Sequence, residues 1–170
     1  MHKRRGFTLI ELLVVITIIS ILSALILGVM AAVQKSSKIR LTEARFQLLK
    51  SGLDRYEHDF DDYPPSNGDD GIKGAISLYE CLITEKKGGP YVKLSDIPTL
   101  DATGQGDTAF SDAWNKPIFY IHHRDYRNQP PNKHEYRLIS SGPDKVFDGG
   151  SKESDDIVNW NKEKAEQQEG

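Results

Sequence analysis

Apolar residues gather in one uninterrupted segment near the start of the chain. The 23 residues from Leu12 to Gln34 include no charged side chain, and about 20 apolar residues in a helix are enough to cross the hydrocarbon core of a bilayer. Proline is absent from Phe7 to His58, which predicts one continuous helix of roughly 78 Å. We divide this helix into a membrane-spanning half, residues 7–34, and an amphipathic half, residues 35–58.

The amphipathic half carries one apolar face. Its large apolar residues, which recur at intervals of three and four positions, are Phe46, Leu49, Leu53 and Tyr56. This spacing is typical of one side of a helix, and we expect a sheet to cover it. The segment 61–68 ends the helix, because it combines two prolines with turn-forming residues.

The pattern after residue 59 predicts a small globular domain that ends near residue 160. A second, short helix is expected over residues 74–84, with its apolar side chains directed inward: Ile76, Leu78, Leu82 and Ile83. Residues 86–112 are rich in glycine and proline, and they are expected to form a long loop.

Two strands are expected in the second half of this domain. Residues 117–122 and 135–140 are rich in aromatic and β-branched side chains, and the turn-forming segment 127–133 separates them, which predicts a hairpin. A brief apolar return at residues 157–160 precedes a polar tail over residues 161–170. The fold class is therefore α+β, with a long N-terminal helix packed on a small antiparallel sheet.

The apolar helix follows a short basic segment, residues 1–6. Basic residues that flank a membrane helix favour the cytoplasmic side, so the globular domain is expected to face outward. A secretory signal would instead have an apolar core of about 7 to 15 residues before a small-residue cleavage site. We therefore expect the apolar helix to remain in the mature protein as an anchor.

Charge and cysteine content narrow the range of functions. The formal net charge is −3, and removal of Lys3, Arg4 and Arg5 would make it −6. An acidic outer domain gives no electrostatic basis for binding nucleic acid. Cys81 is the single cysteine, so no intramolecular disulfide can form. The sequence contains no motif of a nucleophilic enzyme, a nucleotide-binding loop or a metalloprotease, and we do not expect an enzyme.

The segment Arg-Gly-Phe-Thr-Leu-Ile-Glu at residues 5–11 places a glycine, an aromatic residue and one carboxylate at the head of the apolar helix. A flexible glycine allows an extended peptide to enter a protease. The segment resembles the leader signal of type IV pilins and of the pseudopilins of type II secretion. This resemblance implies that a prepilin peptidase cuts between Gly6 and Phe7, removes residues 1–6 as a leader peptide, and methylates the new amine of Phe7.

Glu11 is the one charged residue in the first part of the helix. An ionised group at the centre of a bilayer costs about 2.5 to 3.5 kcal/mol. The resemblance implies that its partner is the amine of Phe7 on a neighbouring subunit, so that Glu11 acts in assembly. Alternatively, Glu11 lies only about 6 Å along the helix from Phe7 and its carboxylate extends to the lipid headgroups.

Gly28 stands where many members of the resembled family have proline. Glycine lowers helix stability by about 1 kcal/mol relative to alanine, which favours local unwinding within a filament. The alternative is close packing between membrane helices, because small residues line such contacts. Both interpretations stay open.

Later blocks resemble the major pseudopilins of type II secretion systems in their order along the chain. They comprise the Tyr-Pro pair at residues 63–64, the turn at 110–118, and the segments 140–144 and 155–160. The resemblance implies a pilin-like fold and a structural subunit that polymerises into a pseudopilus for type II protein secretion. Two alternatives are a type IV pilin for adhesion, motility or DNA uptake, and a membrane-anchored binding or sensor module.

The resemblance also implies partners and a location. The subunit would form a homopolymer, together with minor pseudopilins, at an inner-membrane assembly platform driven by a cytoplasmic ATPase. It would cross the inner membrane once, with its C-terminal domain in the periplasm, and would become part of a periplasmic filament after assembly.

In the resembled family the loop between the last two blocks binds calcium. The ligands carried over to this chain are the carbonyl of Ser141 and the carboxylates of Asp144, Asp155 and Asp156, with Asp148 as a further candidate. Calcium takes six to eight oxygen ligands, and it would relieve the repulsion between clustered carboxylates. The alternative is a solvated acidic turn.

Three histidines near the predicted hairpin, His122, His123 and His134, raise the question of a zinc site. Adjacent side chains on a strand point to opposite faces. We therefore expect that His122 and His123 do not share a metal ion, and we interpret all three as surface histidines.

Overall fold

A computed structural model of the protein describes residues 7–68, 70–125, 136–151 and 153–160, with the backbone alone described over residues 25–29. The chain divides into two compact units, Met1–Ser37 and Lys38–Gly170. The predicted leader, the turn at 127–133, His134 and the tail at 161–170 lie outside the described residues. The predicted boundaries of the leader, the helix halves, the globular domain and the tail stay predictions.

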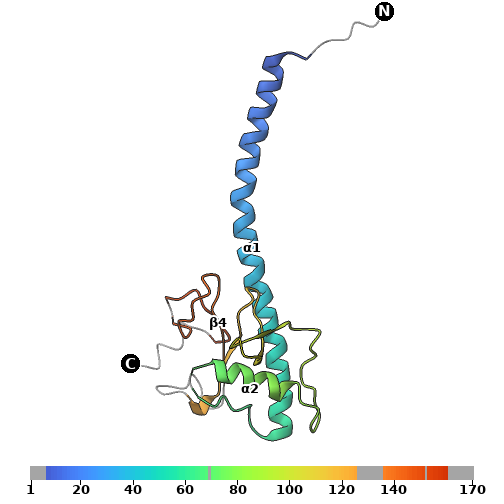
Figure 1. Ribbon diagram of the computed structural model, residues 1–170, viewed down its shortest axis with the longest axis vertical. Coiled ribbons are helices and arrows are strands. Elements are labelled where there is room, and N and C mark those ends of the chain that lie inside the picture. The colour runs from blue at the N-terminus through green and yellow to red at the C-terminus, as the bar shows by residue number, and fades with distance from the viewer. Residues whose placement is uncertain (1–6, 69, 126–135, 152, 161–170) are drawn as a thin grey trace, which may run out of the picture. The chain divides into compact units, whose positions relative to one another are not determined.

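The first helix, α1, extends over Leu9–Phe60 and contains 52 residues (Figure 1). This confirms the long helix predicted for residues 7–58. It ends where Asp61 adopts a left-handed conformation with φ of 60°, while its N–H still donates to the carbonyl of Glu57 at 2.8 Å. Such a residue commonly closes a helix, and two prolines then prevent the helix from continuing.

Among the described residues, no helix has both the length and the apolar character needed to cross a membrane.

The core of the Lys38–Gly170 unit includes the predicted apolar face of α1. Phe46, Leu49 and Leu53 are buried, and Tyr56 packs partly buried against the same cluster. The cover is not a sheet alone, since the cluster also contains Leu78 and Leu82 of the second helix. That helix, α2, extends over Ile72–Leu82, which confirms the short helix expected at 74–84.

Strands β3, Phe119–Ile121, and β4, Arg137–Ser140, pair antiparallel with Phe119 opposite Ile139. The predicted hairpin is therefore confirmed. A third strand, β5 at Ile157–Val158, pairs antiparallel with β4 to give the order β3-β4-β5. The brief apolar return near the end of the domain thus belongs to the sheet.

The prediction that residues 86–112 form one long loop is wrong. Two strands, β1 at Thr99–Asp101 and β2 at Thr108–Phe110, form an antiparallel pair within it. The carboxylate of Asp101 accepts N–H groups from Thr103, Gly104 and Gly106 at 2.8 to 3.1 Å, and this local bonding fixes the turn between the strands.

Helix α2 lies unusually close to strand β3. A Cβ atom added at Gly74 would stand 1.8 Å from the carbonyl oxygen of Tyr120, so no side chain fits at this position. The hydroxyl of Tyr120 donates to the carbonyl of Pro64 at 2.7 Å, and the N–H of His122 donates to the hydroxyl of Ser66 at 3.0 Å. These contacts hold the turn after α1 beside the end of β3.

Candidate functional sites

The described chain begins with a hydrogen-bonded cap on α1. The carboxylate of Glu11 accepts the N–H and the hydroxyl of Thr8 at 2.8 and 2.7 Å, and the N–H of Glu11 points back to the Thr8 hydroxyl at 3.3 Å. This is a capping box, whose signal is a threonine followed by a glutamate three positions later. Sequence reasoning missed Thr8, although that signal was present. The cap holds the Glu11 carboxylate in the first turn of α1.

Phe7, on the other side of the predicted cleavage point from Gly6, is 73% exposed. Gly6 lies outside the described residues, and Gly28 lies within α1, where only the backbone is described.

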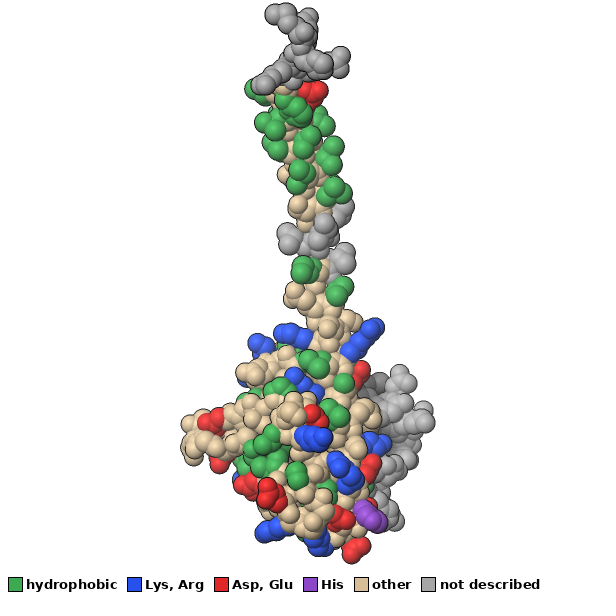
Figure 2. Space-filling view, turned by 90° about the vertical axis from the view of Figure 1, so that its right-hand side faces the viewer, with side chains coloured by type: hydrophobic (Ala, Val, Ile, Leu, Met, Phe, Trp, Pro, Cys, Tyr) green, Lys and Arg blue, Asp and Glu red, His purple; other side chains and the backbone are tan. Residues whose placement is uncertain are grey.

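The first part of α1 exposes many large apolar side chains, and Figure 2 shows those on one face. Those exposed by more than two fifths are Leu9, Ile10, Leu12, Leu13, Val14, Val15, Ile16, Ile18, Ile19, Ile21 and Leu22. The hydroxyls of Thr17 and Ser20 donate to carbonyls one turn earlier at 2.8 and 2.7 Å, so these polar groups are satisfied inside the helix. An apolar surface of this extent marks a membrane or a protein partner.

The predicted calcium loop, residues 141–156, folds back on itself. Asp155 lies against the start of the loop, because a Cβ atom at Gly142 would stand 2.3 Å from the Asp155 carbonyl oxygen and the N–H of Asp144 donates to the Asp155 carboxylate at 3.2 Å. Ser141 is 2% exposed. The structure thus brings the two ends of the predicted ligand set into contact.

Asp156 is the buried member of the set, at 4% exposure. Its Oδ2 accepts the N–H groups of Asp148 and Gly150 at 3.1 and 2.8 Å. Its Oδ1 is buried and accepts no hydrogen bond from the described residues. A buried carboxylate oxygen without a partner is costly, and a cation would satisfy it.

The three aspartates of the set do not converge on one point. Within the described part of the chain, the single group of three metal-ligating side chains with donor atoms within 4.8 Å of one another is Asp62, His122 and His123. The prediction of calcium ligands stays a prediction, which the environment of Asp156 Oδ1 fits.

The block at residues 110–118 forms a turn around a buried carboxylate. Asp112 is 2% exposed and accepts the N–H groups of Trp114 and Lys116 at 2.9 and 2.8 Å and the hydroxyl of Ser140 at 2.6 Å. Arg45 of α1 donates to the neighbouring carbonyl of Ser111 at 2.8 Å. The turn therefore joins α1 to the end of β4.

The asparagine in the block at residues 155–160 bonds to the sheet. Asn159 accepts the N–H of Leu138 on its side-chain oxygen at 2.8 Å, and its amide group donates to the carbonyl of Tyr136 at 3.3 Å. The side chain thus continues the bonding of β5 to β4 beyond the end of the strand.

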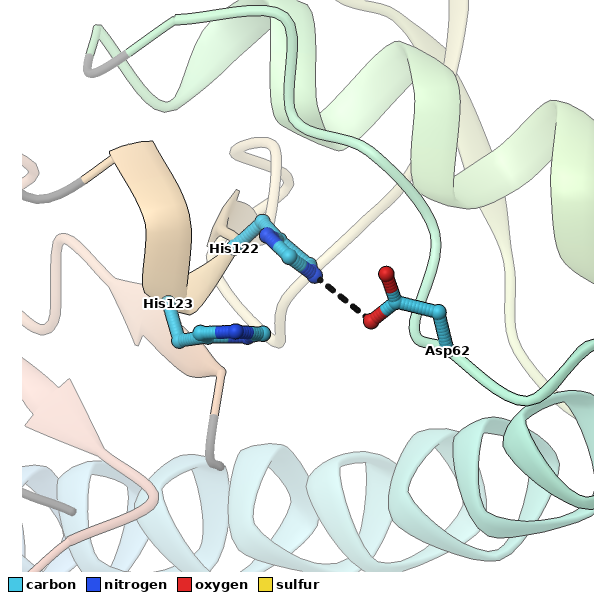
Figure 3. Close-up of side chains that lie close together, drawn as sticks. All are labelled: Asp62, His122 and His123. Carbon is cyan, nitrogen blue, oxygen red and sulfur yellow. Dashed lines mark hydrogen bonds and ion pairs between the residues drawn. The ribbon is translucent and has the colours of Figure 1, made fainter. Parts of the chain in front are cut away.

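The expectation that His122 and His123 point apart is wrong, and so is the interpretation of His122 as a surface residue, since it is 4% exposed. Strand β3 ends at Ile121, and the 3-10 helix η1, His123–Asp125, begins two residues later. The alternation of a strand does not extend over these residues, and the two rings lie with centroids 4.1 Å apart. His122 Nε2 is 3.2 Å from Asp62 Oδ1 (Figure 3).

Asp62 is held as a carboxylate by its neighbours. Burial raises its pKa, but hydrogen bonds from His122 and from the Tyr63 N–H, together with the charges of His122 and Arg124, outweigh this, so the net pKa of Asp62 lies below its ordinary value. The Arg124 guanidinium is 2.8 Å from Asp62 Oδ2.

Comparison with known families decides the identity of the chain. Residues 1–27 match the prokaryotic N-terminal methylation motif, and residues 29–160 match the family described as type II secretion system, protein G. The chain belongs to the type II secretion system protein G family. The resemblance found in the leader and in the later blocks is confirmed.

Curated members of the protein G family match nearly the whole chain. The type II secretion system core protein G of Escherichia coli (strain K12) is 32% identical over 160 residues, which cover 93% of this chain and 92% of the relative. The protein of the same name from Pseudomonas aeruginosa is 28% identical over 159 residues, covering 94% and 96%. That of Klebsiella pneumoniae is 26% identical, covering 94% and 96%.

Membership of the protein G family confirms the predicted role as a structural subunit of the pseudopilus in type II secretion. It supports neither a type IV pilin nor a membrane-anchored sensor module.

Proposed function

We propose that residues 7–34 anchor this protein G subunit in the inner membrane, with its Lys38–Gly170 unit outside the membrane. From there the subunit polymerises into a periplasmic homopolymer. The observation that carries the proposal is the apolar surface around the first part of α1. Such a surface suits lipid before assembly and neighbouring helices afterwards, because both present apolar contacts. The subunit itself carries out no chemical reaction.

The capped first turn of α1 suits an assembly contact. Thr8 fixes the Glu11 carboxylate close to Phe7, where cleavage after Gly6 would create a positive amine. A carboxylate and an amine on neighbouring subunits would neutralise one another in a medium of low dielectric constant. The partners of this process are the prepilin peptidase, the inner-membrane assembly platform, the cytoplasmic ATPase and the minor pseudopilins.

The first test is the N-terminus of the assembled protein. We expect peptide mass spectrometry of filaments to recover a first peptide that begins with N-methylated Phe7, because residues 1–27 match the prokaryotic N-terminal methylation motif and a flexible glycine precedes the expected cut. The Gly6→Leu variant is the control and should retain residues 1–6. Recovery of Met1 or Lys3 peptides from wild-type filaments would contradict the proposal.

We further propose that the loop 141–156 holds a calcium ion through the Ser141 carbonyl and the carboxylates of Asp144, Asp155 and Asp156. Calcium supplies a positive charge that accepts several oxygen ligands. The buried Oδ1 of Asp156, which accepts no hydrogen bond from the described residues, supports this proposal. Many small secreted domains are stabilised by disulfides, whereas Cys81 is a free thiol. The ion would stabilise this loop instead.

Calcium should raise the melting temperature of the full-length protein in detergent. Extracellular calcium sites have dissociation constants of about 10⁻⁴ to 10⁻³ M, and saturation at about 100 times that constant adds about 2.7 kcal/mol, or several degrees. Magnesium should raise the melting temperature less than calcium, because it requires a tighter octahedral shell.

The matched variants for this test are Asp156→Asn, which should lose the gain, and Asp54→Asn on the exposed side of α1, which should keep it. Identical melts of wild-type protein with calcium and with chelator would show that the loop is a solvated acidic turn.

A further inference from the structure

Asp62, His122 and His123 come together from two separate parts of the chain. Asp62 lies in the turn after α1, while the histidines stand where β3 passes into η1. Two long-range hydrogen bonds fix this placement, from the Tyr120 hydroxyl to Pro64 and from the His122 N–H to Ser66. The cluster is therefore built by the fold, and does not depend on chance contact between surface side chains.

The spacing of the donor atoms suits a small metal ion. One donor atom of each residue lies within 4.8 Å of the others, and Asp62 Oδ1 is 3.2 Å from His122 Nε2. Two ligands of a tetrahedral zinc ion with bonds of about 2.0 Å stand about 3.3 Å apart. Asp62 and His123 are only partly buried, so small side-chain rotations would close the remaining gap.

We propose that Asp62, His122 and His123 bind a divalent transition-metal ion, with zinc as the representative. Two imidazoles and one carboxylate are the donor set of zinc and related ions, whereas calcium takes oxygen ligands. Three protein ligands leave a fourth position for water. A cavity of about 370 Å³, lined in part by Asp62, His122, Tyr56 and Tyr63, gives that position room.

The surroundings orient the carboxylate toward an ion. Arg124 contacts Asp62 Oδ2 at 2.8 Å, which leaves Oδ1 directed at His122, as Figure 3 shows. Partners of this kind commonly fix metal ligands. His122 Nδ1 accepts the backbone N–H of Arg124 at 3.2 Å. Once Nε2 binds metal, Nδ1 would carry the imidazole proton, so this hydrogen bond must open.

Bound metal would link the end of α1 to the end of β3. Asp62 and His122 are 60 positions apart in sequence, and a link that closes a long loop restricts the unfolded chain most. We therefore expect the ion to stabilise the folded Lys38–Gly170 unit, at a site separate from the loop 141–156.

The test uses the full-length protein in detergent, stripped of metal with chelator and then titrated with zinc chloride by calorimetry in the presence of calcium. We expect one zinc ion per chain and a higher melting temperature. His123→Gln and Asp62→Asn should each weaken zinc binding by at least about 10-fold, since even the loss of a supporting partner costs that much.

Two controls make the outcome decisive. His58→Gln removes a histidine from the exposed side of α1 and should leave zinc binding unchanged, as should Asp156→Asn. The metal-free variants should melt within a few degrees of metal-free wild type, which separates loss of a ligand from loss of the fold. The proposal is overturned if wild type binds no zinc, or if His123→Gln and His58→Gln bind it equally well.

Discussion

Glu11→Leu should be cleaved and inserted into the membrane normally and yet fail to assemble into filaments. Removing one partner of a buried ion pair leaves the other charge uncompensated, which costs about 3 to 5 kcal/mol. That corresponds to at least about a 100-fold loss in the association constant of each added subunit. Shearing followed by sedimentation would measure the loss as an absence of pelleted filaments.

The capping box supplies a sharper variant of the same experiment. Glutamine also completes a capping box, so Glu11→Gln keeps the bonds to Thr8 and removes only the charge. We expect this variant to fail as well, whereas Glu57→Leu, on the exposed side of α1, should assemble. Normal assembly of Glu11→Gln would reduce the role of Glu11 to helix capping, and normal assembly of Glu11→Leu would show that the carboxylate only extends to the headgroups.

Gly74→Ala should destabilise the Lys38–Gly170 unit severely. Alanine normally stabilises a helix relative to glycine by about 1 kcal/mol, but here its Cβ would stand 1.8 Å from the carbonyl oxygen of Tyr120. Because backbone cannot yield as a side chain does, the loss should reach or exceed about 3 kcal/mol, the upper end of the range for overpacking. Thermal melts should show a fall of roughly 10 °C or more.

Gly52→Ala is the comparison for this prediction. Its nearest contact is a methyl group of Val92 at 2.5 Å, which can move with its side chain, so the loss should be smaller. A Gly74→Ala protein that melts at or above the wild-type temperature would contradict the close approach of α2 to β3.

Elements that a residue pattern marks were predictable from the sequence, and elements without one were not. The 52 residues of α1 carry enough repeats for their period to show. Strands β3 and β4 have only three and four residues, but their aromatic and β-branched side chains predicted them. Strands β1 and β2 contain three residues each within a segment rich in glycine and proline, and bonds to a single carboxylate, that of Asp101, fix their turn.

Site residues that lie within one short segment were predictable from the sequence, and contacts between distant segments were not. The leader motif and Glu11 were found from local sequence, and the capping box was also readable there. The Asp62 and His122 contact joins positions 60 apart, and the rule of alternating faces misled us because β3 ends one residue before His122. The burial of Asp156 Oδ1 likewise depends on how the loop closes, which no spacing shows.

The core of the Lys38–Gly170 unit brings together residues that are synthesised at different times. Phe46, Leu49 and Leu53 of α1 share one cluster with Tyr120 and Leu138, which a ribosome adds much later. At about 5 to 20 residues per second, the apolar face of α1 waits several seconds for its cover. During that interval the apolar face of α1 is exposed in the nascent chain, and it must avoid other apolar contacts until β3 and β4 have been synthesised.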